Sequence, residues 1–136
     1  LGRFFEKNSP STDMILADPK GSIVKDIVEK REPREADYSW LVEGIGGDFI
    51  PETLDIKYIK KAYEVSNEEA FDTVKKLALY EGILAGSSTG TLISAALKFC
   101  KEQEKEKNVV TFVCDNGEKY LNTAYNELWL KEKNLI

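Results

Sequence analysis

Several residue types and patterns that would carry common chemistry are scarce or missing in this chain of 136 residues. It has no histidine, and its two cysteines, Cys100 and Cys114, do not have the spacing of a zinc site. Without histidine, the chain cannot supply a Ser-His-Asp or a Cys-His arrangement. Both cysteines lie in apolar contexts, so we expect buried, reduced thiols without a function.

Targeting and membrane-spanning segments are also missing. No charged stretch is followed by the apolar region of a signal peptide, and no apolar run is long enough to cross a bilayer. These absences predict a soluble, cytoplasmic protein without a membrane partner. The net charge is -5, and lysines and arginines are scattered among acidic residues rather than gathered in a stripe. We therefore expect no nucleic-acid partner.

The length and the hydrophobic content of the chain predict one globular unit over residues 1–136. A chain of this length with 42% hydrophobic residues can bury a single core. The first residue is Leu1, and residues 1–7 resemble the last turns of a helix without a start signal. This pattern predicts that a further segment precedes Leu1.

The first half of the chain contains one predicted strand and one predicted helix. Residues 13–17 form a short apolar run that stops at the turn signal of residues 18–21, and residues 28–38 are charged, contain a proline and predict a surface loop. Ser66 and Glu69 have the spacing of a capping box, which predicts a helix that Gly82 terminates.

The second half continues the alternation of strands and helices. Residues 92–104 predict a helix with Ile93, Ala96, Leu97 and Cys100 on one face. Residues 109–114 are apolar and β-branched, as in a strand buried on both faces, and residues 120–132 predict a last helix. The alternation predicts an α/β fold with a three-layer, mostly parallel sheet and flanking helices.

Two segments rich in glycine follow apolar runs. In residues 43–51, the third glycine of a dinucleotide-binding fingerprint would fall at Phe49, and no helical period follows, so that site is excluded. A loop whose backbone approaches a ligand and a purely structural turn both stay open. Residues 86–91 stand where a strand ends and a helix begins, which is where open α/β sheets bind ligands. On these residues alone, an ordinary helix N-cap is favoured.

Four segments considered together give a more specific interpretation. Residues 42–51, 68–71, 81–90 and 115–121 have the order and spacing seen in cystathionine β-synthases and cysteine synthases, and the chain resembles that family over nearly its whole length. The resemblance implies the tryptophan-synthase-β-like fold of enzymes that depend on pyridoxal 5'-phosphate (PLP), known as fold type II. This chain would be the C-terminal portion of such a catalytic core.

In that family, the lysine that forms the Schiff base with PLP and the phosphate-binding loop lie upstream of the matched segments. The resemblance therefore implies that residues 1–136 contain no catalytic residue and are inactive by themselves. It further implies small-molecule amino-acid substrates and a homodimer. A non-catalytic binding module stays open as an alternative.

The resemblance assigns cofactor-binding roles to residues in two of these segments. Ser88 matches the serine whose hydroxyl meets the pyridine nitrogen of PLP, and a neutral hydroxyl makes the ring a weaker electron sink than a carboxylate would. Gly86 and Ser87 would shape the approach to the ring. Asp115 matches a position beside this serine, although a helix N-cap explains Asp115 equally well.

The remaining matched residues concern the substrates. Glu43, Gly44, Ile45 and Gly46 match a loop that lies over the bound substrate. Glutamate before Gly-Ile-Gly, together with residues 48–51 and 126–130, resembles cystathionine β-synthases, which implies a hydro-lyase that joins L-serine and L-homocysteine into L-cystathionine and water. Cysteine synthases, which use an activated serine and sulfide, tend to carry glutamine at that position and stay open as the alternative.

Overall fold

The computed structural model describes residues 1–32 and 34–136. Two parallel strands, β1 (Met14–Pro19) and β2 (Ile59–Val65), form its sheet. Ala17 lies opposite Tyr63 and Pro19 opposite Val65. The helical elements are α1 (Gly2–Asn8), α2 (Val24–Val28), η1 (Ile56–Tyr58), α3 (Asn67–Glu81), α4 (Ser87–Lys101), η2 (Gly117–Tyr120) and α5 (Glu127–Glu132).

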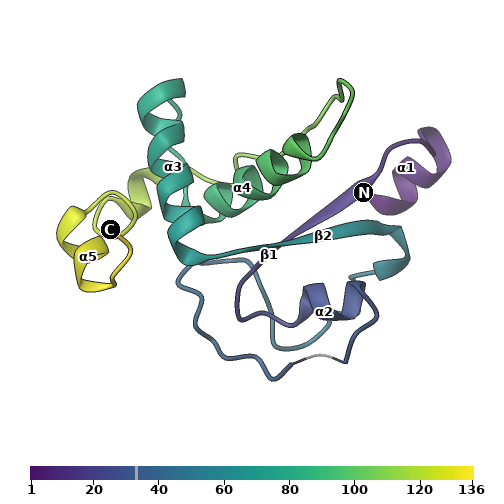
Figure 1. Ribbon diagram of the computed structural model, residues 1–136, viewed down its shortest axis with the longest axis horizontal. Coiled ribbons are helices and arrows are strands. Elements are labelled where there is room, and N and C mark those ends of the chain that lie inside the picture. Colours follow the sequence, from purple (N-terminus) through teal and green to yellow (C-terminus); the bar gives the residue numbers. More distant parts are fainter. Residues whose placement is uncertain (33) are drawn as a thin grey trace.

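Helices cover both faces of this small sheet. Figure 1 shows α4 on one side of the two strands and α2 on the other, with α3 packed along α4. The α/β class and the parallel pairing are therefore confirmed, while the sheet formed by the described residues has two strands. β1 confirms the strand predicted at residues 13–17. β2 was missed because Lys60 and Lys61 interrupt its apolar pattern.

The helix predicted from the capping box is confirmed as α3. The Ser66 hydroxyl accepts the N–H of Glu69 at 3.3 Å, and the Glu69 carboxylate accepts the N–H of Ser66 at 2.9 Å. Gly82 ends the helix with φ of 69°, a left-handed conformation that glycine adopts at low cost. Residues 1–7, expected to be helical, lie largely within α1.

The helix predicted at residues 92–104 begins earlier and buries a different face. α4 starts at Ser87, and its buried side chains include Thr91, Ser94 and Ala95. The expected face is wrong, since Leu97 is exposed. The physical reason is that small side chains let α4 approach α3 closely: a Cβ at Gly90 would lie 2.0 Å from the Ala70 carbonyl oxygen.

The strand predicted at residues 109–114 does not form. These residues have no strand partner within the described part of the chain, and Val110 is 86% exposed. An apolar, β-branched run becomes a strand only where a neighbour pairs with its backbone groups. Cys114 lies in this run and Cys100 on the outer face of α4; both are exposed, so their predicted burial is wrong, and both are free thiols, as expected.

The C-terminal helix predicted at residues 120–132 is shorter than expected. The chain leaves η2 after Tyr120 and re-enters helix only at α5, where the Asn126 side chain accepts the N–H groups of Leu128 and Trp129. Asparagine favours such caps over helix interiors, which explains the break. Trp129 packs against Phe71 of α3 with ring centroids 5.4 Å apart.

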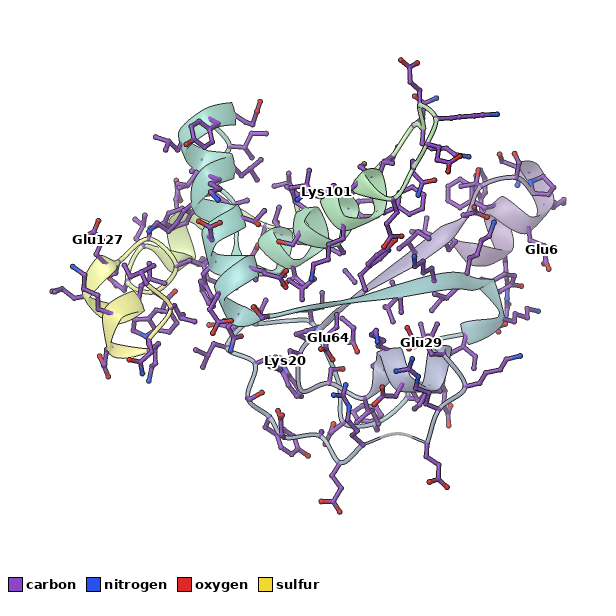
Figure 2. The ribbon with its side chains drawn as sticks, viewed as in Figure 1. Glu6, Lys20, Glu29, Glu64, Lys101 and Glu127 are labelled. Carbon is purple, nitrogen blue, oxygen red and sulfur yellow. The ribbon has the colours of Figure 1, made fainter. Side chains whose placement is uncertain are left out.

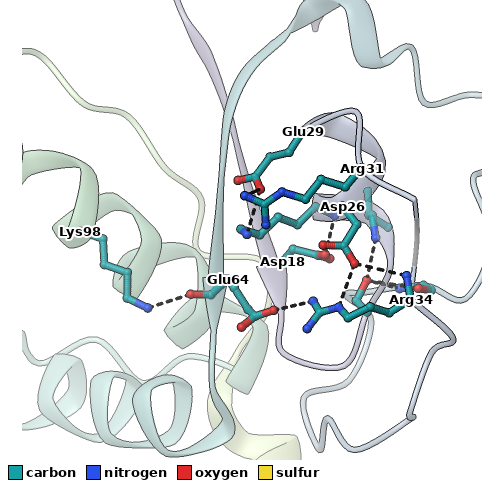
Figure 3. Close-up of polar contacts among 11 residues, drawn as sticks. Asp18, Asp26, Glu29, Arg31, Arg34, Glu64 and Lys98 are labelled. Atoms are coloured by element: carbon teal, nitrogen blue, oxygen red, sulfur yellow. Dashed lines mark hydrogen bonds and ion pairs between the residues drawn. The ribbon is translucent and has the colours of Figure 1, made fainter.

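The charged loop predicted at residues 28–38 contains no helix or strand at its described positions after Val28, and Pro33 of that prediction lies outside the described residues. Arg34 in this loop donates to Asp26 at 2.8 Å and to Glu64 at 2.9 Å, which joins the loop to α2 and β2 (Figure 3). Glu6 and Glu127 lie at opposite ends of the molecule, so charge is spread over its surface (Figure 2). Within residues 1–32 and 34–136, no helix has the length and apolar character needed to cross a membrane.

Candidate functional site

The N-terminus of α4 brings together four of the residues that the sequence singled out. Gly86 is the N-cap, and Ser87 and Ser88 form the first turn. The Gly86 N–H donates to the Asp115 carbonyl oxygen at 3.2 Å, and a Cβ at Gly86 would lie 2.0 Å from the Asp115 carboxylate. Only glycine fits against Asp115 at this distance. Residues 86–91, which the sequence placed between a strand and a helix, are thus helical from Ser87 onward.

Two buried polar atoms at this helix start have no hydrogen-bond partner among the described residues. They are Ser87 Oγ and Asp115 Oδ1, and Ser87 is only 1% exposed. A third such atom, Thr91 Oγ1, lies one turn further along α4. Ser88 is buried as well, with 8% of its surface exposed. Because an unpaired buried polar atom costs free energy, these groups fit a site where a polar ligand supplies the missing hydrogen bonds.

Tyr120 joins this site, although the sequence did not single it out. Its hydroxyl donates to Asp115 Oδ2 at 2.7 Å. This hydrogen bond, burial, and the negative charges of Asp115 and Glu43 raise the pKa of Tyr120 to about 12. The only signal in the sequence was its position within the matched segment 115–121.

The first residue of the glycine loop, Glu43, lies within electrostatic reach of Tyr120. Its negative charge is one of the smaller causes that raise the pKa of Tyr120, after the hydrogen bond to Asp115 and burial. Residues 43 and 120 are far apart in the sequence, so the fold brings them within this range.

Three of the five residues in the loop, residues 43–47, are glycines, so much of its surface is backbone. Gly44 has φ of 73°, and a Cβ at this position would meet nothing within 4 Å, while Gly46 has φ of 86°. A Cβ at Gly46 would lie 2.6 Å from the Pro19 ring, so this glycine also permits close packing. Ile45 is half-buried and packs against the core. Glu43 and Gly44 are exposed.

A cavity of about 300 Å³ lies beside this loop. Its walls include Ile45, Gly46 and Gly47 from the loop, and Asp18 from β1. No helix follows the loop before η1 in the described chain, which confirms that it is not a dinucleotide-binding fingerprint. No cluster of side chains able to hold a metal ion occurs among residues 1–32 and 34–136.

Comparison with known protein families identifies the class of enzymes to which this chain belongs. Residues 1–115 match the family described as pyridoxal-phosphate dependent enzyme, and the chain belongs to that family. The resemblance found in the sequence is therefore confirmed, and members of this family depend on PLP.

Among its relatives, the chain is 34% identical to cystathionine β-synthase of Apis mellifera over 136 residues, which are 100% of this chain and 26% of that protein. It is 43% identical to cysteine synthase A of Salmonella typhi over 95 residues, or 69% of this chain and 29% of that protein. Mouse cystathionine β-synthase is 29% identical over 136 residues, 100% of this chain and 24% of that protein. The chain thus spans about a quarter of the length of these relatives.

Proposed function

We propose that this chain forms one side of the active site of a PLP-dependent enzyme that joins L-serine and L-homocysteine into L-cystathionine and water. The observation that carries the proposal is geometric: Ser87 Oγ and Asp115 Oδ1 are buried without partners in the described chain at the α4 N-terminus, where the Tyr120 hydroxyl bonds Asp115. The α4 N-terminus would be the cofactor side of the site and the glycine loop the substrate side.

The residues at the start of α4 fit the cofactor. Ser87 Oγ and Asp115 Oδ1 are buried without partners in the described chain, which leaves hydrogen-bonding capacity beside Ser88. In this proposal Ser88 meets the pyridine nitrogen through its hydroxyl, Gly86 and Ser87 shape the approach, and Asp115 lies behind them. When bound, PLP supplies an electron sink for negative charge at the α-carbon of the substrate.

The hydroxyl of Ser88 would tune that sink. A serine hydroxyl is neutral and cannot hold the ring nitrogen protonated as a carboxylate would. This weaker sink suits loss of the serine hydroxyl at Cβ rather than chemistry that needs a long-lived carbanion. Tyr120, with its pKa raised to about 12, stays protonated and keeps its hydrogen bond to Asp115.

The glycine loop would cover the substrate. Gly44 and Gly46 have positive φ angles, and Gly44 has open space where a side chain would stand, so the backbone can approach a bound amino acid closely. Ile45 anchors the loop to the core. We place Glu43 over the second substrate, where its carboxylate favours homocysteine.

A cysteine synthase is the second candidate, because the chain is 43% identical to cysteine synthase A of Salmonella typhi over 95 residues. The deciding test supplies the intact protein, loaded with PLP, with serine and homocysteine or with an activated serine and sulfide. Amino-acid chromatography measures both products. We expect cystathionine to form faster; cysteine as the sole product would establish the second candidate, and neither product would favour a non-catalytic module.

Replacing Glu43 by Gln tests the assignment of the second substrate. We expect the addition of homocysteine to slow more than the loss of water from serine, because the carboxylate lies over the substrate and not at the ring. Stopped-flow absorbance follows the two half-reactions separately. The matched control is Glu52→Gln, an exposed glutamate in the same segment. Equal slowing of both half-reactions by Glu43→Gln would contradict the assignment.

A further inference from the structure

One buried hydroxyl outside the described site holds the glycine loop. Ser22 is 2% exposed, and its Oγ accepts the N–H of Gly47 at 3.0 Å and lies 3.2 Å from the Gly47 carbonyl oxygen, to which it donates. The N–H of Ile23 donates to the same carbonyl oxygen at 3.0 Å. Both backbone groups of Gly47 are thus bonded to the turn that follows β1.

Ser22 is itself fixed by the end of β1. Its N–H donates to the Pro19 carbonyl oxygen at 3.1 Å, and Lys20 is bonded to Val65 of β2 at 2.8 Å. Asp18, which is 2% exposed, accepts the N–H of Lys25 at 2.8 Å and so ties the strand to α2 (Figure 3). The turn is therefore held by the sheet on one side and by α2 on the other.

Apart from the packing of Ile45 against the core, the rest of the loop has few other restraints. Gly47 is the loop residue whose backbone groups bond to another element of the described chain, while Gly44 is exposed and Gly46 is held by packing against Pro19 and Trp40. Two glycines have wide conformational freedom, so a loop that contains them needs an anchor to keep one geometry. The Ser22 hydroxyl supplies two of the bonds at that anchor.

We propose that Ser22 is a positioning residue: through Gly47 it fixes residues 43–47 in the geometry that receives the amino-acid substrate. The inference rests on the proposed function of this loop. Ser22 touches neither substrate nor cofactor in this role. Its removal should therefore loosen the loop and weaken substrate binding, while the cofactor side at α4 is unchanged.

The test compares Ser22→Ala with the wild type in the intact, PLP-loaded protein, with Ser11→Ala as the control because Ser11 is exposed on a turn. Hydrogen exchange followed by mass spectrometry measures the peptide that covers residues 43–49 and a peptide from α3. We expect exchange in the loop peptide to rise about tenfold in Ser22→Ala, with no change in α3, because the Gly47 N–H loses its partner. The KM for the amino acid should rise several-fold with little change in kcat.

The outcomes separate this inference from the proposed function. Unchanged exchange in residues 43–49 would overturn the role of Ser22 whatever the enzyme catalyses. Faster exchange in the loop with an unchanged KM would show that Ser22 holds the loop but does not position substrate, which also overturns the inference. If exchange in α3 also rises in Ser22→Ala, the test uses Ser22→Cys, which has a side chain of similar size and a weaker hydrogen-bonding group. Ser22→Cys must then raise exchange in residues 43–49 without raising it in α3. A wild type with neither proposed activity would refute the function, while the exchange result would still report on the anchor.

Discussion

The α4 N-terminus and the glycine loop are held in different ways. Gly86 and Ser87 are buried at the start of α4, where a carbon added at Gly86 would overlap Asp115 and Tyr120. The loop is exposed at Gly44 and bonded to the core mainly through Gly47. The proposed cofactor side is therefore buried beside the hydrophobic core, whereas the proposed substrate side depends on a few hydrogen bonds and on the packing of Ile45. Changes at the first should affect all chemistry, and changes at the second should affect substrate choice.

The largest effect is expected from Ser88→Asp in the intact protein. A carboxylate beside the pyridine nitrogen would favour its protonated form and change the electron sink, so the rate of β-replacement should fall by about 100-fold or more while PLP stays bound. Steady-state kinetics measure the rate, and the absorbance of PLP after gel filtration measures retention.

The loop offers the contrast to this substitution. Ile45→Val removes one methylene at a half-buried position and should leave PLP binding and most of the rate intact. If Ser88→Asp lost PLP and activity in parallel while its circular dichroism stayed unchanged, Ser88 would hold the cofactor rather than tune it. That result would contradict the predicted effect of Ser88 on the rate alone.

A matched pair of glycine substitutions compares the two regions directly. Gly90→Ala should destabilise by about 3 kcal/mol, because its Cβ would overlap the Ala70 carbonyl oxygen of the neighbouring helix. Gly44→Ala should cost only about 1 kcal/mol, because it has open space and the cost comes mainly from a positive φ of 73°. Urea denaturation measures both, and equal costs would show that the loop is packed as tightly as the helix pair.

The parts of the fold that could be predicted from the sequence are those decided by local chemistry. Ser66, Glu69 and Gly82 mark the ends of α3 through bonds within a few residues of each end. The strand predicted at residues 109–114 failed because pairing needs a partner that the local pattern cannot supply. Interactions between distant residues also escaped prediction: nothing local indicates that Ser22 bonds Gly47.

The candidate site follows the same division. The matched segments singled out Ser88 and Glu43, and the roles of both residues stay predictions. Tyr120 was missed because its role depends on burial and on a hydrogen bond, which a sequence does not display. Contacts between residues that are distant in the sequence are thus the features that only the structure reveals.

Tyr120→Phe tests the hydrogen bond to Asp115 beside the α4 N-terminus. Loss of the phenol would leave Asp115 Oδ2 without its donor at 2.7 Å, beside an Oδ1 that has no partner in the described chain, and should cost about 2 kcal/mol. The raised pKa sets the pH window: the stabilisation is fully present below pH 10, the ordinary value, and is lost as the pH rises toward about 12.

Two measurements check this prediction. Urea denaturation at pH 7 gives the cost of Tyr120→Phe, and ultraviolet difference titration should show one phenol fewer ionising near pH 12 in the variant. Tyr80→Phe is the control, since Tyr80 is 71% exposed on α3. If Tyr120→Phe removed a phenol that ionises near pH 10, the bond to Asp115 would contribute little.

The smallest effect is expected at the start of α3, which supports the approach to the loop. Asn67 in the first turn accepts the N–H of Leu41 at 2.8 Å and donates to the Ser39 carbonyl oxygen at 2.9 Å, so this turn holds the chain just before residue 43. Glu69 stabilises the same turn: its carboxylate accepts the N–H of Ser66 at 2.9 Å and pairs with Lys98 at 2.7 Å.

Glu69→Gln should cost less than about 1 kcal/mol at pH 7, because the glutamine oxygen can still accept the Ser66 N–H and only the charge of a partly exposed ion pair is lost. Burial acts to raise the pKa of Glu69, but hydrogen bonds from Lys98 and from the Ser66 N–H outweigh it and lower this pKa below its ordinary 4.5. A lowered pKa in the folded state means that the stabilisation is complete above pH 4.5 and is lost as the pH falls through the folded value. Urea midpoints of the variant and the wild type should converge below pH 4, while Glu81→Gln at the other end of α3 should cause no such pH-dependent loss. The KM for the amino acid should rise less in Glu69→Gln than in Ser22→Ala. An equal rise would show that the start of α3 holds the glycine loop as firmly as Ser22 does.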